Sequence, residues 1–363
     1  MNYKQKLVLI IGLTSLTAFF TILLLLTVLC CTGRRVKGEN VSRDAESPFE
    51  QKEGDNVVKA EGLISYHGGE DLTAHEILDA PGEVIGKSSY GTLYKASLVN
   101  SSSLALLRFL RPTCTLRAKE SLPIVELLGS IRHPNLVPLI AFYGGPKGEK
   151  LMVHPFYASG NLAHFIKCGN AEARKWAVIY KISIGIAEGV HHLHSFQEKP
   201  VIHGNLKSKN ILLDRHQNPY VSDFGLHLLL NPTAGQKMLE ASASQGYKPP
   251  ELIKMRDASR ESDVYSLGVI LLELLTGKLP IEENPNPDQD FYLPSVLRTA
   301  ILDDRIMELY HPDILVGMSN DRRAITEDRI LRFFQLAMAC CSPSRLLRPE
   351  INEVLEKLRE IGE

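Results

Sequence analysis

The sequence contains few cysteines and has no excess of either charge. Only six of its 363 residues are cysteines, too few for a disulfide framework, and none forms a Cys-x-x-Cys pair of the kind that binds zinc. Lys and Arg together number 41 and Asp and Glu 42, a net charge of −1 that excludes a strongly basic nucleic-acid binder. Hydrophobic residues make up 44% and charged residues 23%, which are ordinary values for a globular protein. We therefore expect a folded chain of more than one unit, with no nucleic-acid partner.

One long apolar stretch lies near the N-terminus. Residues 7–31 carry no charge, and a helix of this length spans about 37 Å, enough to cross a bilayer core of ~30 Å. A cleaved signal peptide is the alternative, but its apolar region is shorter, about 7–15 residues, and the basic pair Arg34-Arg35 follows this one. We expect a short extracytoplasmic segment at 1–6, a single transmembrane helix at 7–31 and a juxtamembrane linker at 32–71.

Two cysteines stand at the predicted membrane edge. Cys30 and Cys31 precede basic residues, a setting in which palmitoylation occurs. The alternative is that both simply complete the apolar span. With six residues before the span, we expect no external ligand-binding domain.

Secondary-structure patterns change character along the rest of the chain. Residues 83–85, 92–96 and 104–110 are predicted to be strands, the first two separated by a Gly/Ser turn. Downstream the apolar residues recur at helical spacing. The predicted helices are 121–130, with Pro123 near its start, 171–195, 262–276, 328–341 and 351–361. Strands followed by helices predict an α+β fold of two lobes.

Six motifs follow one another in a fixed order. They are Gly86-Lys87-Ser88-Ser89-Tyr90-Gly91, His203-Gly204-Asn205-Leu206-Lys207-Ser208-Lys209-Asn210, Asp223-Phe224-Gly225, Pro249-Pro250-Glu251, Asp263-Val264-Tyr265-Ser266-Leu267-Gly268 and Arg348-Pro349. This order resembles the protein-kinase signature set. Together with Ile131-Arg132-His133-Pro134-Asn135-Leu136-Val137, it is most similar to plant receptor-like kinases of the leucine-rich-repeat branch whose catalytic loop also has His-Gly-Asn.

The resemblance implies a bilobal protein-kinase-like domain at 72–361. Its strand-rich N-lobe would be 72–153 and its helical C-lobe 157–361. In that family the kinase domain is cytoplasmic, so the resemblance implies a single-pass protein of the plant plasma membrane whose C-terminal domain lies in the cytoplasm. The resemblance also implies ATP and Mg as ligands, and active receptor-like kinases or other membrane signalling proteins as partners beside the lipid bilayer.

Three catalytic positions depart from the family pattern. Phosphoryl transfer uses a lysine on the third strand, paired with a glutamate on the small-lobe helix. Matching Leu104-Ala105-Leu106-Leu107 to Val-Ala-Val-Lys places Leu107 at the lysine position, and the glutamate position is Ile124. Arg108 would point away from the side shared by Ala105 and Leu107 unless a bulge reorients it, and Glu126 lies on the opposite helix face from Ile124. The catalytic base, normally aspartate, is Asn205, whose amide accepts no proton at neutral pH.

Other positions match the family. The nucleotide-binding candidates are Gly86, Ser88, Gly91, Leu93, Ala105 and Leu212, and the metal-binding candidates are Asn210 and Asp223. Among the structural candidates, His203, Phe224 and Leu128 match the packed column that links the lobes, Glu251 and Arg348 match a buried ion pair of the large lobe, and Asp263 matches its helix anchor. The histidines His191, His192 and His194 are spread around one helix and are not expected to bind a metal. Gly204 replaces the arginine that reads a phosphorylated activation loop, so control through that arginine is not available.

Preserved architecture with altered chemistry is the pattern of a pseudokinase. Our first hypothesis is a membrane-anchored pseudokinase that acts as a scaffold or allosteric partner. A Ser/Thr kinase of low activity, in which Lys207 supplies charge without a base, is the second. An unrelated membrane-tethered module is the third, and the order of the motifs opposes it.

Overall fold

The computed structural model describes residues 62–98, 103–168, 171–196, 200–253, 258–281, 292–305 and 308–362. The predicted transmembrane helix at 7–31, with Cys30 and Cys31, lies outside these ranges. Within them, no helix is both long enough and apolar enough to span a membrane.

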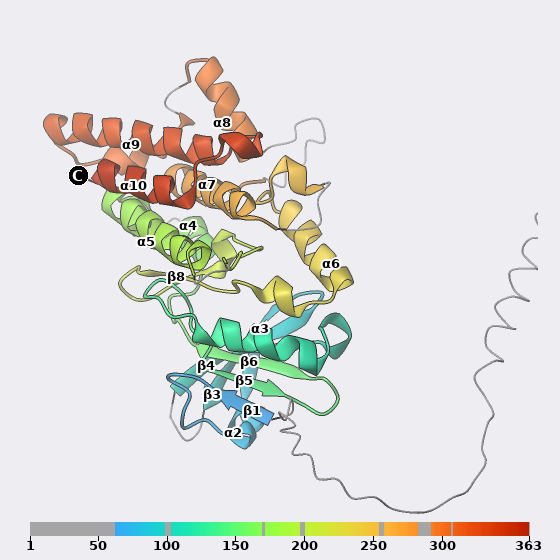
Figure 1. Cartoon of the computed structure of the whole chain (residues 1–363). Coiled ribbons are helices and arrows are strands. Elements are labelled where there is room, and N and C mark those ends of the chain that lie inside the picture. The colour runs from blue at the N-terminus through green and yellow to red at the C-terminus, as the bar shows by residue number, and fades with distance from the viewer. Residues whose placement is uncertain are drawn as a thin grey trace, which may run out of the picture. The chain divides into compact units, whose positions relative to one another are not determined.

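Six antiparallel strands form the sheet of the N-lobe (Figure 1), in the order β1-β5-β6-β4-β3-β2. Their bounds are β1 Gly62–Ser65, β2 Gly82–Lys87, β3 Gly91–Leu98, β4 Ser103–Leu110, β5 Ala141–Gly144 and β6 Lys150–Pro155. Because β1 pairs with β5, residues 62–65 belong to the N-lobe. The expectation that the linker continues to Asp71 is therefore wrong for residues 62–71.

The two faces of this sheet are both covered. On one face a short helix, α2 (Ala74–Asp79), buries Ile77 in an apolar cluster with side chains of β3, β4 and β6. The other face contributes to the main core together with α3 (Ala118–Ser130). Helix α3 begins three residues earlier than predicted, since Glu120 accepts a hydrogen bond from the Arg117 N–H and closes its first turn. Pro123 therefore lies inside the helix rather than near its start.

The C-lobe is built from helices and one small two-stranded sheet (Figure 1), β7 (Ile211–Leu213) with β8 (Pro219–Val221). Its helices are α4 Leu162–Lys167, α5 Trp176–His194, α6 Pro232–Ala243, α7 Arg260–Thr276, α8 Leu293–Leu302, α9 Asn320–Cys340 and α10 Ile351–Gly362. Helix α7 is buried along nearly its whole length and packs against α5 and α9, while α10 packs against α5. Two predicted ranges shift: the predicted helix at 171–195 begins as a 3-10 turn before α5, and α9 starts eight residues before position 328.

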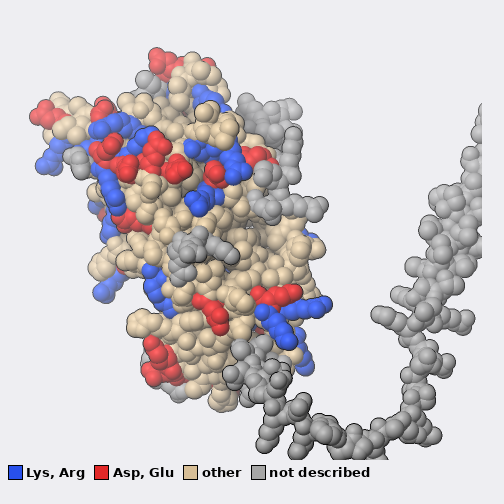
Figure 2. All heavy atoms as spheres, in the orientation of Figure 1, with Lys and Arg blue, Asp and Glu red and all other residues tan. Residues whose placement is uncertain are grey.

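The main core is continuous between the lobes. It runs from Leu128 on α3, through Phe224, to the buried helices of the C-lobe. Cys340 and Cys341 are part of it, and a Cβ atom added to Gly268 on α7 would lie 2.6 Å from the Cβ of Cys340. This close approach of α7 to α9 requires glycine at position 268. Outside the core, acidic and basic side chains intermingle over α9 and α10 on the face shown in Figure 2.

Candidate nucleotide site and catalytic loop

The glycine-rich turn between β2 and β3 uses its own backbone groups. The Ser88 N–H donates to the Gly91 carbonyl at 2.9 Å, and the Gly91 N–H donates to Ser88 Oγ at 3.1 Å. A glycine at position 88 would have left the Gly91 N–H available for a phosphate oxygen. Gly91 itself is required, because a Cβ atom there would lie 2.4 Å from the Phe109 carbonyl oxygen.

The tip of the same turn is held down onto the N-lobe. The Arg111 N–H donates to the Tyr90 carbonyl and the Arg111 Nη1 donates to the Ser89 carbonyl, both at 2.9 Å. Tyr90 is only 7% exposed and belongs to the main core with Val125 and Leu128 of α3. Burial raises the pKa of the Tyr90 hydroxyl, and the nearby Asp223 carboxylate raises it further. The aromatic ring therefore lies in the core beside α3, near Asp223.

Strand β4 orients its side chains differently from the sequence-based expectation. Ala105 and Leu107 share a face, as predicted, but this face lies in the cluster under α2 and both residues are buried there. Arg108 lies on the other face and reaches the C-lobe. The assignments of Leu107 to the lysine position and of Ala105 to the adenine wall are therefore wrong.

The register of the sheet identifies the residues that replace them. Arg108 pairs with Leu93 of β3 and with Met152 of β6. Leu106, which projects to the same face of β4 as Arg108, pairs with His154 of β6. Directly opposed residues of antiparallel strands project to the same side. Arg108 therefore stands at the lysine position, and Leu106, two residues earlier, stands where the family has alanine. No bulge is needed for this orientation, because the pairing of β4 with β3 is regular.

Arg108 forms the charged contact at the centre of the cleft. Its Nη2 donates to both carboxylate oxygens of Asp223, each at 2.7 Å. The two side chains are only 11% and 10% exposed, so the ion pair lies in a region of low dielectric, where charge pairing is strong. Asp223 has a φ of +64°, a left-handed conformation that is rare for a residue other than glycine and is typical of functional sites. The pair joins β4 of the N-lobe to the Asp223-Phe224-Gly225 segment of the C-lobe.

Helix α3 presents an apolar side chain toward the same core. Ile124 is partly buried and packs against the main core, whereas Glu126 is exposed. Leu128, one turn after Ile124, is buried, and a Cβ atom added to Gly225 would lie 2.7 Å from its Cδ2. Ile124 and Glu126 thus lie on different faces of α3, as predicted.

The catalytic loop is organised around a buried carboxylate of α7. Asp263 accepts the N–H of His203 at 2.7 Å and the N–H of Gly204 at 3.0 Å, and it contacts His194 Nε2 at 3.1 Å. Burial opposes ionisation of Asp263, but the hydrogen bond and charge of His194 outweigh it and lower its pKa. Burial lowers the pKa of His203 to about 4. Asp263 is therefore the anchor of this loop.

Gly204 is needed in this loop for two reasons. Its φ is +74°, which favours glycine, and a Cβ atom there would lie 2.5 Å from His227 Nδ1. Its carbonyl accepts a hydrogen bond at 2.6 Å from Lys248, whose pKa burial lowers to about 8.

The base position is occupied by a buried amide. Asn205 is 2% exposed, and its Oδ1 has no hydrogen-bond partner among the described residues. The Asn205 carbonyl accepts a hydrogen bond from Asn210 Nδ2 at 2.9 Å. Lys207 donates to Gln245 at 3.3 Å. The loop keeps the backbone arrangement of a catalytic loop without a carboxylate at the base position.

The segment after Gly225 is attached to the residues that lead into α3. A 3-10 turn, η4 (Leu226–Leu229), contacts α3, the Leu116 N–H donates to the Leu229 carbonyl at 3.0 Å, and Thr115 forms a β-bridge with Leu230. Asn231 then caps helix α6 by accepting the Ala234 N–H at 2.9 Å. This segment, which we call the activation segment, is thus folded and begins with the 3-10 turn followed by helix α6.

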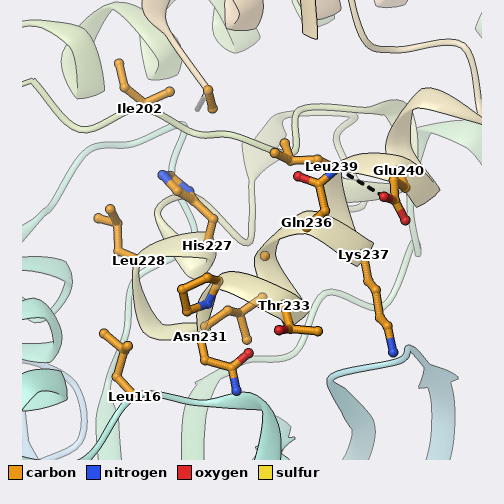
Figure 3. Close-up of a pocket in the computed structure, with 14 residues that line it drawn as sticks. Leu116, Ile202, His227, Leu228, Asn231, Thr233, Gln236, Lys237, Leu239 and Glu240 are labelled. Atoms are coloured by element: carbon orange, nitrogen blue, oxygen red, sulfur yellow. Dashed lines mark hydrogen bonds between the residues drawn. The ribbon is translucent and has the colours of Figure 1, made fainter. Parts of the chain in front are cut away.

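A cavity of about 1050 Å³ opens beside this segment (Figure 3). Its lining includes apolar side chains such as Leu116 and Leu228, and polar side chains of α6 such as Lys237. The described lining residues include none of the nucleotide-binding candidates. The cavity is therefore separate from the nucleotide cleft.

The remaining structural candidates form the large-lobe ion pair. Arg348 contacts both carboxylate oxygens of Glu251, and its Nη2 lies 2.8 Å from Glu251 Oε2. Burial alone would raise the pKa of Glu251, but the hydrogen bonds from Arg348 outweigh it and lower this pKa. Arg348 also donates to the carbonyls of Ser342 and Glu261 and stacks on Tyr265, 4.8 Å from its ring centre.

Sequence reasoning missed a second buried polar cluster beside the catalytic loop. Ser208 contacts the Tyr247 hydroxyl at 2.7 Å and donates to Glu273 at 3.1 Å, and Tyr247 donates to the other Glu273 oxygen at 2.8 Å. Burial raises the pKa of Glu273 to about 8. An isolated glutamate within the apolar run of α7 was the signal in the sequence, since such a side chain must be hydrogen-bonded.

The histidines of α5 do not converge. His194 contacts Asp263, whereas the ring of His192 stacks on that of His133, with centres 4.9 Å apart. Among the described residues, no group of three or more His, Cys, Asp or Glu side chains is arranged to hold a metal ion.

The two lobes, the glycine-rich turn, the loop around Asn205 and the Asp223-Phe224-Gly225 segment define a protein-kinase domain. The chain matches the protein kinase domain family over residues 80–357. It therefore belongs to the protein kinase family.

The relatives of the chain are plant receptor-like kinases. It is 37% identical over 331 residues to the kinase-like protein TMKL1 of Arabidopsis thaliana, covering 89% of this chain and 48% of that one. It is 39% identical over 300 residues to the leucine-rich repeat receptor-like protein kinase IMK3 of the same plant, covering 82% and 37%. A protein named a probable inactive receptor kinase, also from Arabidopsis thaliana, is 33% identical over 290 residues, covering 79% and 43%. The chain thus spans less than half the length of these three relatives.

Solved structures of the same kind resemble this fold. The kinase domain of maize SIRK1, crystallised with AMP-PNP, matches with a TM-score of 0.72 and 30% identity, over 83% of this chain and 100% of that one. The pseudokinase domain of BIR2, an immune regulator, matches with a TM-score of 0.68 and 26% identity, over 84% and 90%. These matches confirm the predicted resemblance and the bilobal fold. Because the relatives include both a nucleotide-bound kinase domain and a pseudokinase, family membership alone does not decide catalysis.

Proposed function

We propose that this chain is a membrane-anchored receptor-like pseudokinase, a signalling scaffold or allosteric partner of active receptor-like kinases. The observation that carries the proposal is the amide of Asn205 at the base position. An amide does not accept the proton of a substrate hydroxyl at neutral pH. The carboxylates near this loop are already engaged, since Asp263 binds the loop backbone and Asp223 binds Arg108. Neither is available as a substitute base.

The lysine–glutamate pair of the N-lobe is also changed. An arginine replaces the lysine and contacts Asp223, and Ile124 replaces the glutamate. Arginine and lysine are not equivalent at such a site, because the planar guanidinium binds a carboxylate with several donors. Ile124 and Asn205 lack the charge that the transfer of a phosphoryl group uses, and the charge of Arg108 is bound by Asp223.

What survives in the chain is the frame of the domain. Asp263 fixes the catalytic loop, Arg348 joins Glu251 to two carbonyls, and Leu128 and Phe224 lie in one core. A fixed shape without transfer chemistry suits a docking surface. The predicted helix at 7–31 would hold this surface beside other membrane kinases, with the C-terminal domain in the cytoplasm, and so raise its effective concentration near them.

The test is a phosphoryl-transfer assay on the full chain, purified in detergent. We expect no transfer to a general protein substrate above that of the Asp223→Ala variant, which lacks the carboxylate that holds a metal ion in an active kinase. Transfer by the wild-type chain that disappears in Asp223→Ala would establish a Ser/Thr kinase of low activity instead. A contaminating kinase would give equal signals in both proteins, so the pair of variants separates the two cases.

The anchoring part of the proposal has its own test. A fragment without residues 1–31 should leave the membrane fraction and fail to replace the full chain in a null mutant, although its domain still folds. Full replacement by that fragment at normal expression would show that the anchor is not part of the function.

A further inference from the structure

The cleft between the lobes contains a cation supplied by the chain itself. In an active kinase the carboxylate equivalent to Asp223 holds a metal ion that bridges the nucleotide phosphates. Here both oxygens of Asp223 accept hydrogen bonds from Arg108 Nη2 at 2.7 Å. A magnesium ion requires carboxylate oxygen at about 2.1 Å in near-octahedral geometry, so it can bind Asp223 only after the guanidinium has left.

Removal of the guanidinium from this place would be unfavourable. Arg108 is only 9% exposed, and its Nε already has no hydrogen-bond partner among the described residues. Without Asp223, the buried positive charge would have no counter-charge, and an uncompensated buried charge is strongly destabilising. The residues around this position therefore fit an internal ion pair and do not fit a metal ion.

The glycine-rich turn is also engaged in contacts within the chain. Tyr90 of this turn is buried in the core beside α3, and Arg111 donates hydrogen bonds to the carbonyls of Ser89 and Tyr90. Ser88 accepts the Gly91 N–H that a phosphate would otherwise use. The Gly91 N–H of this turn is therefore already hydrogen-bonded and is not available to bind a phosphate.

The adenine side of the cleft carries a similar change. Leu106 shares the face of Arg108 and is buried, 7% exposed. With Arg108 at the lysine position, Leu106 occupies the place of the small alanine that borders adenine in the family. Its larger side chain reduces the room for the base.

We propose that Arg108 is the permanent cation of this cleft, and that the chain binds neither magnesium nor ATP. The Arg108–Asp223 pair then holds the lobes together in place of a nucleotide and its metal. The docking surface would keep one conformation at every ATP concentration. This inference deepens the proposed function and rests on it.

The experiment measures thermal unfolding of the full chain in detergent, with and without ATP and magnesium. At about 1 mM ATP, a site with a Kd of ~10 µM would be stabilised by RT ln(1 + 100), about 2.7 kcal/mol. We expect no shift of the melting temperature for the wild-type chain. A shift that disappears in Asp223→Asn would overturn the inference, and if that chain still transferred no phosphate, the proposed function would stand.

A variant designed to open the cleft gives the converse result. Tyr90→Ala, Leu106→Ala and Arg108→Lys together remove the aromatic ring, enlarge the space for adenine and restore the lysine. We expect this variant to gain a shift with ATP and magnesium, and the same variant with Asp223→Asn to lack it. If the folded variant, checked by circular dichroism, shows no shift, these three side chains are not what excludes the nucleotide, and the inference fails. If it does not fold, the Arg108→Lys variant is compared with the wild-type chain by titration with terbium, a probe for carboxylate-bound cations. The variant should bind terbium at least tenfold more tightly than the wild-type chain. Equal binding would overturn the inference.

Discussion

The Glu251–Arg348 pair provides the clearest prediction of stability. The side chain of Arg348 is fully buried, while that of Glu251 is 22% exposed. Glu251→Ala removes the carboxylate and leaves the guanidinium with the Ser342 carbonyl at 2.9 Å, the Glu261 carbonyl at 3.1 Å and the Tyr265 ring. Breaking a buried pair from one side costs about 3–5 kcal/mol. Because these contacts remain, we expect Glu251→Ala to cost about 3 kcal/mol, near the lower end of that range.

The reciprocal substitution should cost more. Arg348→Ala leaves Glu251 without its partner and also frees the two carbonyls, so we expect a loss of about 5 kcal/mol. Glu353, which pairs with Lys357 on the exposed face of α10 with both side chains about half exposed, is the matched control, and Glu353→Ala should cost only about 0.3–0.5 kcal/mol. Urea unfolding of the full chain measures all three. A loss for Glu251→Ala no larger than that for Glu353→Ala would refute the reasoning, because the pair would then behave as a surface contact.

Two further predictions concern the catalytic loop. Gly204→Ala should lower the free energy of unfolding by about 1–2 kcal/mol, because the residue is left-handed and gains a Cβ atom, and by a further amount because this Cβ atom would clash with His227. In a His227→Ala background the loss from the clash should vanish. Unchanged stability in either background would contradict the φ of +74°. The pKa of His203 falls from its usual 6.5 to about 4 in the folded chain, so the unfolded chain binds more protons between these values and stability falls as the pH drops. Between pH 6.5 and 5 this residue should remove about 1.6 kcal/mol of stability, measured by urea unfolding. His203→Gln should lose that part of the pH dependence, and an identical dependence in the variant would show that His203 does not titrate in this way.

The orientation of β4 shows where reasoning from the sequence stopped. Alternation correctly separated Arg108 from Ala105 and Leu107, but it did not identify which face borders the cleft. Because apolar residues occupy both faces of this strand, the alternation of side chains does not indicate which face borders the cleft and which lies under α2. The contact of Arg108 with Asp223, between distant parts of the chain, decides it. The remaining clue was Arg108 itself, because a charged residue in an apolar strand needs a partner when it is buried.

The motifs of the C-lobe were more predictable. Asp263, Glu251 and Arg348 act through contacts that their positions in the motifs implied, and the structure brings each to its expected neighbours. The glycine-rich turn was harder, because its spacing is the same whether the turn is open or closed. Only the hydrogen bonds of Ser88 and Arg111, together with the burial of Tyr90, reveal that it is closed. The serine at position 88, whose hydroxyl accepts the Gly91 N–H, was a signal for this in the sequence.

Several contacts join the two lobes without a ligand, and two of them bear on turnover. One is the Arg108–Asp223 pair in the cleft. The other is the β-bridge between Thr115 and Leu230, which Lys150 supports by donating to Thr115 Oγ1 at 3.0 Å and to the Leu116 carbonyl at 2.8 Å. In a kinase that works through repeated turnover, such links would oppose the opening that releases the product. In the pseudokinase that we propose there is no product to release, so the same links can fix the lobes and the activation segment without loss of function.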